Sequence, residues 1–232
     1  MAFYNIADLC VQMDVSGRTA VQAKPYEIRQ GNADIVLRYD AQKTMEGNDW
    51  IEDLDMAEYM ASGAVFARKL LRYDGFQLHA SSVILNDKAY LFSAPSGTGK
   101  STHTEKWVRL FGARYLNDDK PALRYTDGVW TAYGTPWSGK HDLSRPEKAP
   151  LGAIAFVRRG TENGVQRLSP QEAIPYFISQ LLRVIPAELM DLQLTLLDRL
   201  LREIPVYLLT CRNDDEAAYV ARAGMEVQDG SA

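Results

Sequence analysis

A glycine-rich turn near the middle of the chain has the residue types and spacing of a phosphate-binding loop. Its sequence, Ala94-Pro95-Ser96-Gly97-Thr98-Gly99-Lys100-Ser101, follows the pattern G-x-x-x-x-G-K-[ST], with alanine in place of the first glycine. Backbone N–H groups in such a turn, together with a helix N-terminus, form a positive cup for β- and γ-phosphates. In this pattern the lysine reaches the phosphate oxygens and the serine hydroxyl binds Mg²⁺.

The segments on either side of the turn are those that such a loop requires. The apolar Tyr90-Leu91-Phe92 predicts a strand before the turn, and residues from Thr102 to Phe111 predict a helix after it. A chance glycine-rich hairpin turn would not bring a strand, a lysine, a hydroxyl and a helix together in this order. We therefore predict that residues from Ala94 to Thr102 bind a nucleotide, with Lys100 on the phosphates and Ser101 on the metal.

Two adjacent carboxylates, Asp118 and Asp119, follow the next predicted strand at 113–117. Phosphoryl transfer needs an acidic group for Mg²⁺ and a group that orients or deprotonates the attacking hydroxyl. The mutual repulsion of the two carboxylates is relieved by a divalent cation or by a raised pKa in one of them. Asn-Asp-Asp alone is also common in solvated turns. Beside a phosphate loop we favour a catalytic and metal-binding role, with the two residues not assigned separately.

The histidines and one aromatic loop are further candidates. His79 lies in a predicted strand two elements before the phosphate loop, where a partly buried structural histidine is the usual finding. His103 and His141 are weaker candidates, and a solvent-facing position on the loop helix is a simple alternative for His103. The segment 134–140, GTPWSGK, combines turn-forming residues with Trp137 and suggests a loop that covers a ligand. On composition alone, a surface loop anchored by its tryptophan is favoured.

Composition places limits on the class of protein. The 232 residues, 46% of them hydrophobic and 24% charged, suit one globular domain or one domain with a small appendage. A net charge of -4 argues against a broad surface for nucleic acid or membranes. Cys10 and Cys211 lack metal-ligand spacing and are expected to be reduced thiols of a cytoplasmic protein. We find neither a signal-peptide pattern nor an apolar stretch of membrane-spanning length.

Hydrophobic periodicity predicts an α/β fold: a mixed central sheet with the loop and its helix, a small N-terminal β section and a helical C-terminal layer. Residues 1–53 are expected to form the β-rich section, which packs on the core and edges or extends the main sheet, with a polar loop at 41–53. Residues 54–232 are expected to form the domain with the phosphate loop.

The expected elements can be given by their residue ranges. The predicted strands are 76–85, 88–93, 113–117, 121–126, 129–133, 151–157 and 206–211. Five helices are predicted. The first begins near Asp55 and ends at Gly75, and the second covers 102–111. The third follows the capping box at 169–172, the fourth covers 186–202, and the fifth begins near Asp214. The positions expected to face the core in the third and fourth helices are Ile174, Phe177, Ile178, Leu181 and Leu182, and Leu189, Leu192, Leu196 and Leu200. Residues 225–232 are expected to be frayed.

Three segments in the same order, HAS, LFSAPSGTGKS and LNDDKPAL, resemble the catalytic domain of the HPr serine kinase/phosphorylase family. That family is related in fold to ATP-dependent phosphoenolpyruvate carboxykinase. The resemblance covers roughly residues 76–160 and is closest to the compact, HPr-kinase-related proteins of bacteria. GTPWSGK occupies the place of the family's second glycine-rich signature and differs from it in composition.

The resemblance implies ATP and Mg²⁺ as ligands of the phosphate loop. It implies that Lys100 and Ser101 handle the phosphates and Mg²⁺. One residue of the Asp118-Asp119 pair would bind metal and the other would act as the base toward a hydroxyl. It also implies that His79 lies close to the γ-phosphate.

These features predict an Mg-ATP-dependent kinase that phosphorylates a hydroxyl of a peptide, protein or small molecule. The basic residues proposed to orient acceptor or phosphate are Lys140, Arg145, Arg158 and Arg159. One alternative is a non-catalytic ATP-binding module that switches a partner interaction, and another is a carboxykinase-like metabolic enzyme, for which the chain is short. The expected partners are a nucleotide and a hydroxyl-bearing acceptor, without nucleic acid or membrane, and a homo-oligomer stays open.

Overall fold

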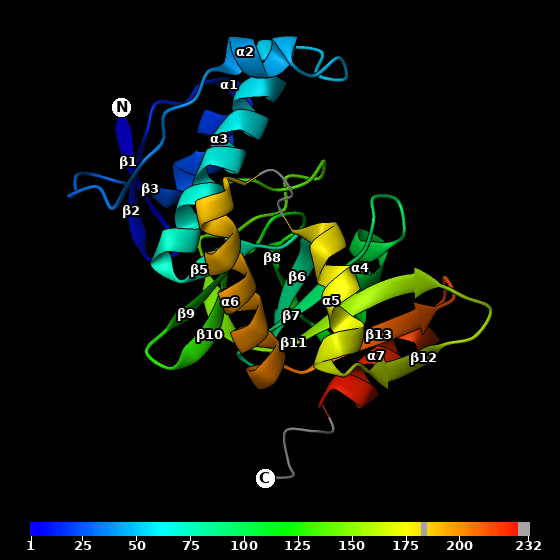
Figure 1. Ribbon diagram of the computed structural model, residues 1–232. Coiled ribbons are helices and arrows are strands. Elements are labelled where there is room, and N and C mark those ends of the chain that lie inside the picture. Colours follow the sequence, from blue (N-terminus) through cyan, green and yellow to red (C-terminus); the bar gives the residue numbers. More distant parts are fainter. Residues whose placement is uncertain (182–184, 227–232) are drawn as a thin grey trace.

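The computed structural model describes residues 1–181 and 185–226, and it has a mixed β-sheet at its centre with helices on both faces (Figure 1). This arrangement confirms the predicted α/β class. The strands of the sheet are β5 (Gly75–Gln77), β6 (Ala80–Leu85), β7 (Lys88–Ser93), β8 (Arg114–Asn117), β9 (Ala122–Thr126), β10 (Val129–Tyr133), β11 (Lys148–Arg159), β12 (Gly164–Arg167) and β13 (Val206–Cys211). Their order is β5-β9-β10-β11-β7-β6-β8, with β13 also paired to β11 and β12 paired to β13.

Strand direction explains why the candidate residues meet at one edge of the sheet. The strands β7, β11 and β13 are parallel neighbours. Because β6 is antiparallel to both β7 and β8, the strand β8 runs in the same direction as β7. The C-terminal ends of β7, β8, β11 and β13 therefore lie at one edge, where β6 begins. In open α/β sheets, ligands bind outside the carboxyl ends of such strands.

Two hairpin turns that the sequence predicts are confirmed. Asn86 and Asp87 join β6 to β7, and Asp127 and Gly128 join β9 to β10; all four residues have positive φ. Positive φ at both central residues is the requirement of a type I′ turn, which Asn, Asp and Gly meet at low cost. The strand predicted at 76–85 is interrupted at Leu78 and His79, so that it forms β5 and β6. The short strand β12 was not predicted.

The N-terminal section differs from its prediction in two ways. Its strands form a separate sheet of order β3-β1-β2-β4 and do not extend the central one. The segment predicted as a loop at 41–53 contains a helix, because the Asp40 side chain accepts a hydrogen bond from the Lys43 N–H and caps it. The elements are β1 (Ala2–Ile6), β2 (Leu9–Met13), α1 (Gly17–Ala23), a 3₁₀ turn (Lys24–Tyr26), β3 (Glu27–Ile28), β4 (Ile35–Val36) and α2 (Ala41–Glu46).

Five longer helices complete the fold: α3 (Leu54–Leu70), α4 (Lys100–Phe111), α5 (Pro170–Gln180), α6 (Ala187–Glu203) and α7 (Glu216–Glu226). The helix α3 ends earlier than predicted, in a 3₁₀ turn (Leu71–Tyr73) with Asp74 in the left-handed conformation. It packs against the N-terminal sheet through buried residues that include Ile6, Val11 and Phe66. The division of the chain after residue 53 stays a prediction.

The C-terminal helices present narrower apolar faces to the sheet than the sequence pattern predicts. The capping box of Ser169 and Glu172 is confirmed at the start of α5. However, Ile174 and Ile178 on α5 and Leu192 on α6 are exposed, because these helices each contact the core along one stripe, which in α5 contains Ala173 and Phe177. Leu182 and the tail at 227–232 lie outside the described residues.

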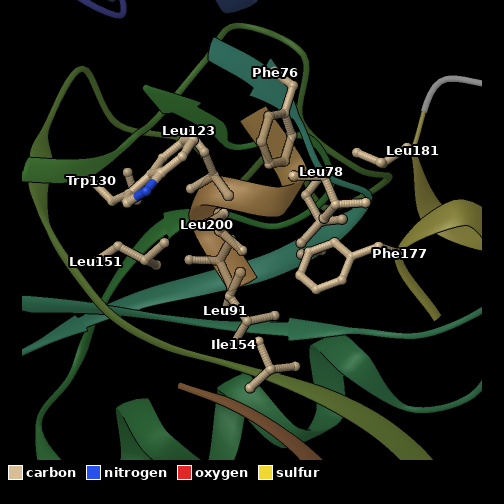
Figure 2. Packing of buried hydrophobic residues seen from close by; sticks show 14 of the residues in the cluster. Phe76, Leu78, Leu91, Leu123, Trp130, Leu151, Ile154, Phe177, Leu181 and Leu200 are labelled. Carbon is tan, nitrogen blue, oxygen red and sulfur yellow. The ribbon is translucent and has the colours of Figure 1, made fainter. Parts of the chain in front are cut away.

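The apolar core between the sheet and these helices supports the strand that leads into the phosphate loop. Leu91 of β7 and Ile154 of β11 are fully buried there beneath Phe177 of α5 and Leu200 of α6 (Figure 2). Replacing a buried phenylalanine by alanine typically costs about 3–5 kcal/mol of stability. The phosphate loop thus follows a strand, β7, that is buried on both faces. The neighbouring strand β11 is buried in the same way, as its near-continuous apolar stretch at 151–157 predicts.

On the other face of the sheet, α4 is anchored by a buried pair that corrects the prediction for His103. Trp107 is fully buried against Phe92 of β7, with ring centroids 5.1 Å apart. Its Nε1–H donates to His103 Nε2 at 3.1 Å, and the histidine is only 2% exposed rather than facing solvent. Residues four apart share one helix face, so the burial of Trp107 brings His103 inward with it.

Burial, with the nearby charge of Lys106 adding to its effect, lowers the pKa of His103 to about 3. In the unfolded chain the histidine titrates near 6.5, so below that pH the unfolded state binds a proton that the folded state does not. The free energy of unfolding should therefore fall by about 2 kcal/mol between pH 7.5 and pH 5 from this residue alone. Denaturant titrations of His103→Gln should lack this component, whereas the exposed His141→Gln should retain it. Equal pH dependence in both variants would contradict the assignment.

Candidate active site

The phosphate loop has the backbone geometry that its sequence predicts. Gly97 and Gly99 have φ of +76° and +119°, conformations that residues with a side chain rarely adopt. A Cβ at either position would meet no atom within 4 Å, so the space above the loop is open. The helix α4 begins at Lys100, directly after Gly99. The N–H groups of its first turn lack partners within the helix, which is the arrangement that binds anions.

Two basic side chains contact the carbonyl groups of this loop. Lys100 Nζ donates to the Ala94 carbonyl oxygen at 2.8 Å, and Arg159 Nη2 donates to the Gly97 carbonyl oxygen at 2.7 Å. Burial lowers the pKa of Lys100, while the charge of Asp119 acts in the opposite direction. Anionic oxygens in the loop would be stronger acceptors for Lys100 than the neutral carbonyl that it contacts here.

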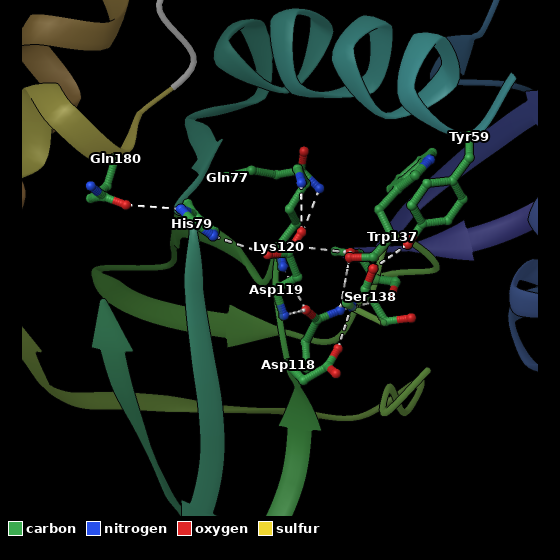
Figure 3. A network of polar contacts seen from close by, with 12 residues as sticks. Tyr59, Gln77, His79, Asp118, Asp119, Lys120, Trp137, Ser138 and Gln180 are labelled. Atoms are coloured by element: carbon green, nitrogen blue, oxygen red, sulfur yellow. Dashed lines mark hydrogen bonds and ion pairs between the residues drawn. The ribbon is translucent and has the colours of Figure 1, made fainter. Parts of the chain in front are cut away.

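Asp119 is the centre of a network of ionic hydrogen bonds (Figure 3). Its Oδ1 lies 3.1 Å from His79 Nε2, and its Oδ2 lies 2.6 Å from Lys120 Nζ. The other ring nitrogen of His79 lies 2.8 Å from Gln180 Oε1 at the end of α5. Burial alone would raise the pKa of Asp119, but the contacts with His79 and Lys120 lower it well below its usual range. Asp119 is therefore ionised at neutral pH.

Asp118 has a different environment, although it is the adjacent residue. One of its oxygens accepts a hydrogen bond from the Gly139 N–H. Burial raises the pKa of Asp118, partly offset by that hydrogen bond, and the neighbouring charge of Asp119 raises it further. The two carboxylates thus have pKa values displaced in opposite directions. Such a displacement is how adjacent acidic groups take on separate roles in catalysis.

The buried side chain of Asn117 holds this pair of carboxylates in position. Its Oδ1 accepts hydrogen bonds from the N–H groups of Asp119 and Lys120, at 2.9 and 2.7 Å. Its Nδ2 donates to the carbonyl oxygen of Thr135 at 2.9 Å. Residues 117–119, Asn-Asp-Asp, therefore form a turn that the asparagine side chain stabilises, as this sequence commonly does. Asn117 and Asp118 are buried and Asp119 is half-buried, so the turn is not a solvated one, and both carboxyl groups line the cleft that the phosphate loop also lines.

The loop at 134–140 is anchored by its tryptophan and also lines the cleft. Trp137 is fully buried, stacks on Phe66 with ring centroids 4.8 Å apart, and donates to Ser62 Oγ at 3.0 Å. The next residues, Ser138 and Gly139, lie at the cleft. The predicted anchoring by the tryptophan is thus confirmed, but residues 134–138 are buried and do not form a surface loop. This anchoring places the Gly139 N–H against Asp118.

One residue at the cleft, Arg18 of α1, was not predicted from the sequence. Its Nη2 donates to the Gly139 carbonyl oxygen and to Asp142 Oδ1, each at 2.7 Å. Its guanidinium lies over the ring of Tyr59, 4.4 Å from the centroid. Arg18 precedes Gly139 by 121 positions, and nothing in its local sequence marks it. Only the packing of the N-terminal section on α3 brings it to the site.

The cleft bounded by these groups has a volume of about 510 Å³. The candidate residues that line it are His79, Ser96, Gly97, Gly99, Lys100, Ser101, Thr102, Asp118, Asp119, Lys140 and His141. Ala94, Pro95 and Thr98 belong to the same loop but face an adjoining hollow on its other side. Arg145 and Arg158 are not brought to the cleft, because Arg145 pairs with Glu147 and Arg158 Nε donates to Thr210 Oγ1.

The donor groups at the cleft fit Mg²⁺ bound together with phosphate. Among residues 1–181 and 185–226, no group of three or more His, Cys, Asp or Glu side chains could hold a metal ion. Mg²⁺ at a phosphate site is instead bound by one or two protein oxygens, with waters and phosphate oxygens completing an octahedron. The Ser101 hydroxyl and the ionised Asp119 carboxylate supply oxygens of this kind.

The interactions of Arg18 lead to an expected result for its substitution. Arg18→Met keeps an unbranched side chain of similar length but removes the guanidinium from Tyr59 together with both of its hydrogen bonds, so the Gly139 N–H is held less firmly against Asp118. Because a charged hydrogen bond contributes about 1.5–3 kcal/mol, we expect turnover to fall about tenfold or more with nucleotide affinity unchanged. The exposed Arg29→Met serves as the control in the same rate assay. Equal turnover in the two variants would show that Arg18 does not position this loop.

Comparisons with known proteins add little to these observations. No protein-family model matches the sequence, and no curated protein matches it. Among solved structures, the HPr(Ser) kinase/phosphatase from Coxiella burnetii is similar, with a TM-score of 0.39 and 9% sequence identity over 66% of this chain and 99% of that chain. Neither the fold class nor the site depends on this likeness. Within the described residues, no helix has the length and apolar character to cross a membrane.

Proposed function

We propose that the protein is an Mg-ATP-dependent kinase that transfers the γ-phosphoryl group to a hydroxyl of its acceptor. The observation that carries this proposal is that two adjacent carboxyl groups with different partners, Asp118 and Asp119, line the same cleft as Lys100 and Ser101 of the phosphate loop. A nucleotide-binding module without chemistry needs the loop and one metal ligand. Such a module has no need for a second, buried carboxyl group, Asp118, whose pKa differs from that of Asp119.

The phosphate loop and two charged groups would bind the nucleotide. The N–H groups from Gly97 to Ser101 would hold the β- and γ-phosphates, with Lys100 turning from the Ala94 carbonyl to the phosphate oxygens. Ser101 and Asp119 would hold Mg²⁺, which supplies charge neutralisation on the β- and γ-phosphates when bound. Lys120, which contacts Asp119, adds positive charge near these oxygens, and His79 holds the other Asp119 oxygen.

Asp118 would receive the proton of the acceptor hydroxyl. As the hydroxyl oxygen forms its bond to the γ-phosphorus, the bond to the β-phosphate oxygen breaks, and the proton passes to the Asp118 carboxylate. A raised pKa makes a carboxylate a stronger base near neutral pH than an ordinary aspartate. The hydrogen bond from Gly139 leaves one Asp118 oxygen for the acceptor. This assigns the base role to Asp118 and the metal role to Asp119.

A second hollow beside the loop would suit the nucleoside. It has a volume of about 490 Å³ and lies between α4 and the chain after β13. Lys106 of α4 and Asn213, joined by a hydrogen bond of 3.2 Å, form part of its wall together with Arg212. Polar donors at this position could contact ribose and base while the phosphates extend over the loop toward Asp118.

Two alternative functions remain open to the same test. A regulatory module would bind ATP and a partner without turnover. A carboxykinase-like enzyme would need further basic groups and metal ligands. Of the basic residues proposed from the sequence, Arg145 and Arg158 are engaged away from the cleft, and Lys140 lines it together with Arg18 and Lys120.

The test is incubation of the purified protein with Mg²⁺, γ-labelled ATP and cell extract, followed by identification of labelled molecules. We expect label on a hydroxyl-bearing acceptor, and none when Mg²⁺ is removed with a chelator. Tight ATP binding without any labelled acceptor would contradict the kinase and favour the regulatory module.

A further inference from the structure

A separate apolar cavity of about 350 Å³ adjoins the catalytic cleft. It lies between α3, the interruption between β5 and β6, and the end of α5. Four residues line both the cavity and the cleft: Tyr59, Met60, His79 and Lys120. The two hollows are therefore separated only by the side chains that contact Asp119 and by the edge of α3.

Apolar groups form most of the wall of this cavity, and they are Met60, Ala64, Ala67, Leu78, Trp137 and Leu181. Helix α3 contributes only small residues toward its middle, because Gly63 and Ala64 come one after the other and Ala67 follows one turn later. Packing requires glycine at position 63, because a Cβ there would lie 2.9 Å from Trp137 Cδ1. Ala64 and Ala67 also line the cavity, so larger side chains at these positions would occupy part of it.

The charges at the cavity exclude some occupants. The basic side chains at its rim are Lys120 and His79, and both already contact Asp119. No carboxylate is among the described residues that line it, so a cationic group would enter without a counter-ion. An apolar group would instead gain by leaving water, as in most small-molecule sites.

We infer that this cavity is the acceptor subsite, which receives an apolar group of amino-acid side-chain size placed next to the hydroxyl that is phosphorylated. The inference rests on the proposed kinase function and adds the class of acceptor to it. The nucleotide is not a candidate occupant, because its phosphates lie at the loop and the polar hollow for its nucleoside is on the far side of that loop from α3. Asp118 lies in the cleft that adjoins this cavity, so an acceptor whose hydroxyl reaches Asp118 can place a neighbouring group in the cavity.

The experiment measures transfer from Mg-ATP to paired acceptors that differ in the neighbouring group. One pair is a serine peptide with leucine or asparagine beside the serine, and the other is 3-methyl-1-butanol or ethylene glycol. We expect the apolar member of at least one pair to be phosphorylated about tenfold or more faster, the size of discrimination that an apolar pocket gives. The pair that is used identifies whether the acceptor is a peptide or a small molecule.

Ala64→Phe, which fills the cavity, should remove this preference, and Ala64→Leu should reduce it. Leu54→Phe, an exposed position on the same helix, should leave it unchanged. Melting temperature and Mg-ATP affinity should be unaffected in all three. Equal rates on apolar and polar acceptors in the unaltered protein, or an unchanged preference in a folded Ala64→Phe, would overturn the inference.

A binding measurement separates failure of the subsite from failure of the kinase proposal. Methyl NMR signals of Met60, Ala64 and Ala67 should shift on addition of the apolar member of whichever pair is used, the leucine peptide or 3-methyl-1-butanol, and not of its polar partner, with or without turnover. Shifts without any phosphoryl transfer would support the subsite and contradict the kinase. Transfer without these shifts would support the kinase and overturn the subsite.

Discussion

Asp118→Asn should lower the turnover number for phosphoryl transfer about 10²- to 10⁴-fold, the usual contribution of a general base. The amide keeps the shape of the side chain and can still accept the hydrogen bond from the Gly139 N–H. It cannot take a proton from the acceptor hydroxyl. Because Asp118 is not expected to hold Mg²⁺, the affinity for Mg-ATP should change little. Initial rates and equilibrium titrations with Mg-ATP give the two quantities.

The pH dependence of the unaltered protein provides a second check on Asp118. A base must be ionised to act, and burial raises the pKa of this carboxyl. The rate should therefore rise with pH through a midpoint above the value near 3.9 of an ordinary aspartate. Asp119→Asn should instead weaken Mg-ATP binding, and the exposed turn variant Asp127→Asn should behave as the unaltered protein. Loss of Mg-ATP affinity in Asp118→Asn with normal affinity in Asp119→Asn would reverse the assignment of the two residues.

Lys100→Ala should lower turnover about 10²- to 10³-fold, the loss typical for one preorganised donor to a developing charge. Its ammonium group is nearly buried, lies at the Ala94 carbonyl, and is the cation placed within the loop itself. Removing it leaves the phosphate oxygens with backbone N–H donors alone. Mg-ATP affinity should also fall, because a hydrogen bond to a charged group contributes about 1.5–3 kcal/mol. Isothermal titration and initial rates measure both effects.

The control for Lys100→Ala is Lys69→Ala, which removes an exposed lysine on α3 and changes the net charge equally. It should leave rate and affinity unchanged. If Lys100→Ala retained both full rate and full affinity, the loop would not be a nucleotide site. A loss of rate with unchanged affinity would still be consistent with transfer, since it would place the contribution of Lys100 in the transition state alone.

The sequence predicts the central part of this molecule well because the signals there are local. The phosphate loop, the hairpin at Asn86-Asp87 and the capping box at Ser169 each depend on a few neighbouring residues whose backbone preferences agree. The position of Asp118 and Asp119 beside the loop follows from strand direction, which a short strand after a loop helix already indicates. What could not be read was the environment that displaces their pKa values in opposite directions.

The features that the sequence did not predict depend on distant contacts. His103 is buried because Trp107 on the same helix face packs on Phe92, and polarity alone indicates solvent. Arg18 reaches Gly139 only because a separate N-terminal sheet packs on α3. The apolar cavity is formed by α3, the β5–β6 interruption and α5, and no one of these segments marks it. Tertiary packing, rather than local propensity, determines these parts of the site.

The most direct test of the central claim is to follow the γ-phosphorus of Mg-ATP by ³¹P NMR in the presence of cell extract depleted of nucleotides. With the unaltered protein, a phosphate monoester signal should grow at the rate at which ADP forms, and Asp118→Asn should abolish both. Inorganic phosphate formed in place of the monoester, or ATP that stays intact while bound, would contradict transfer to a hydroxyl.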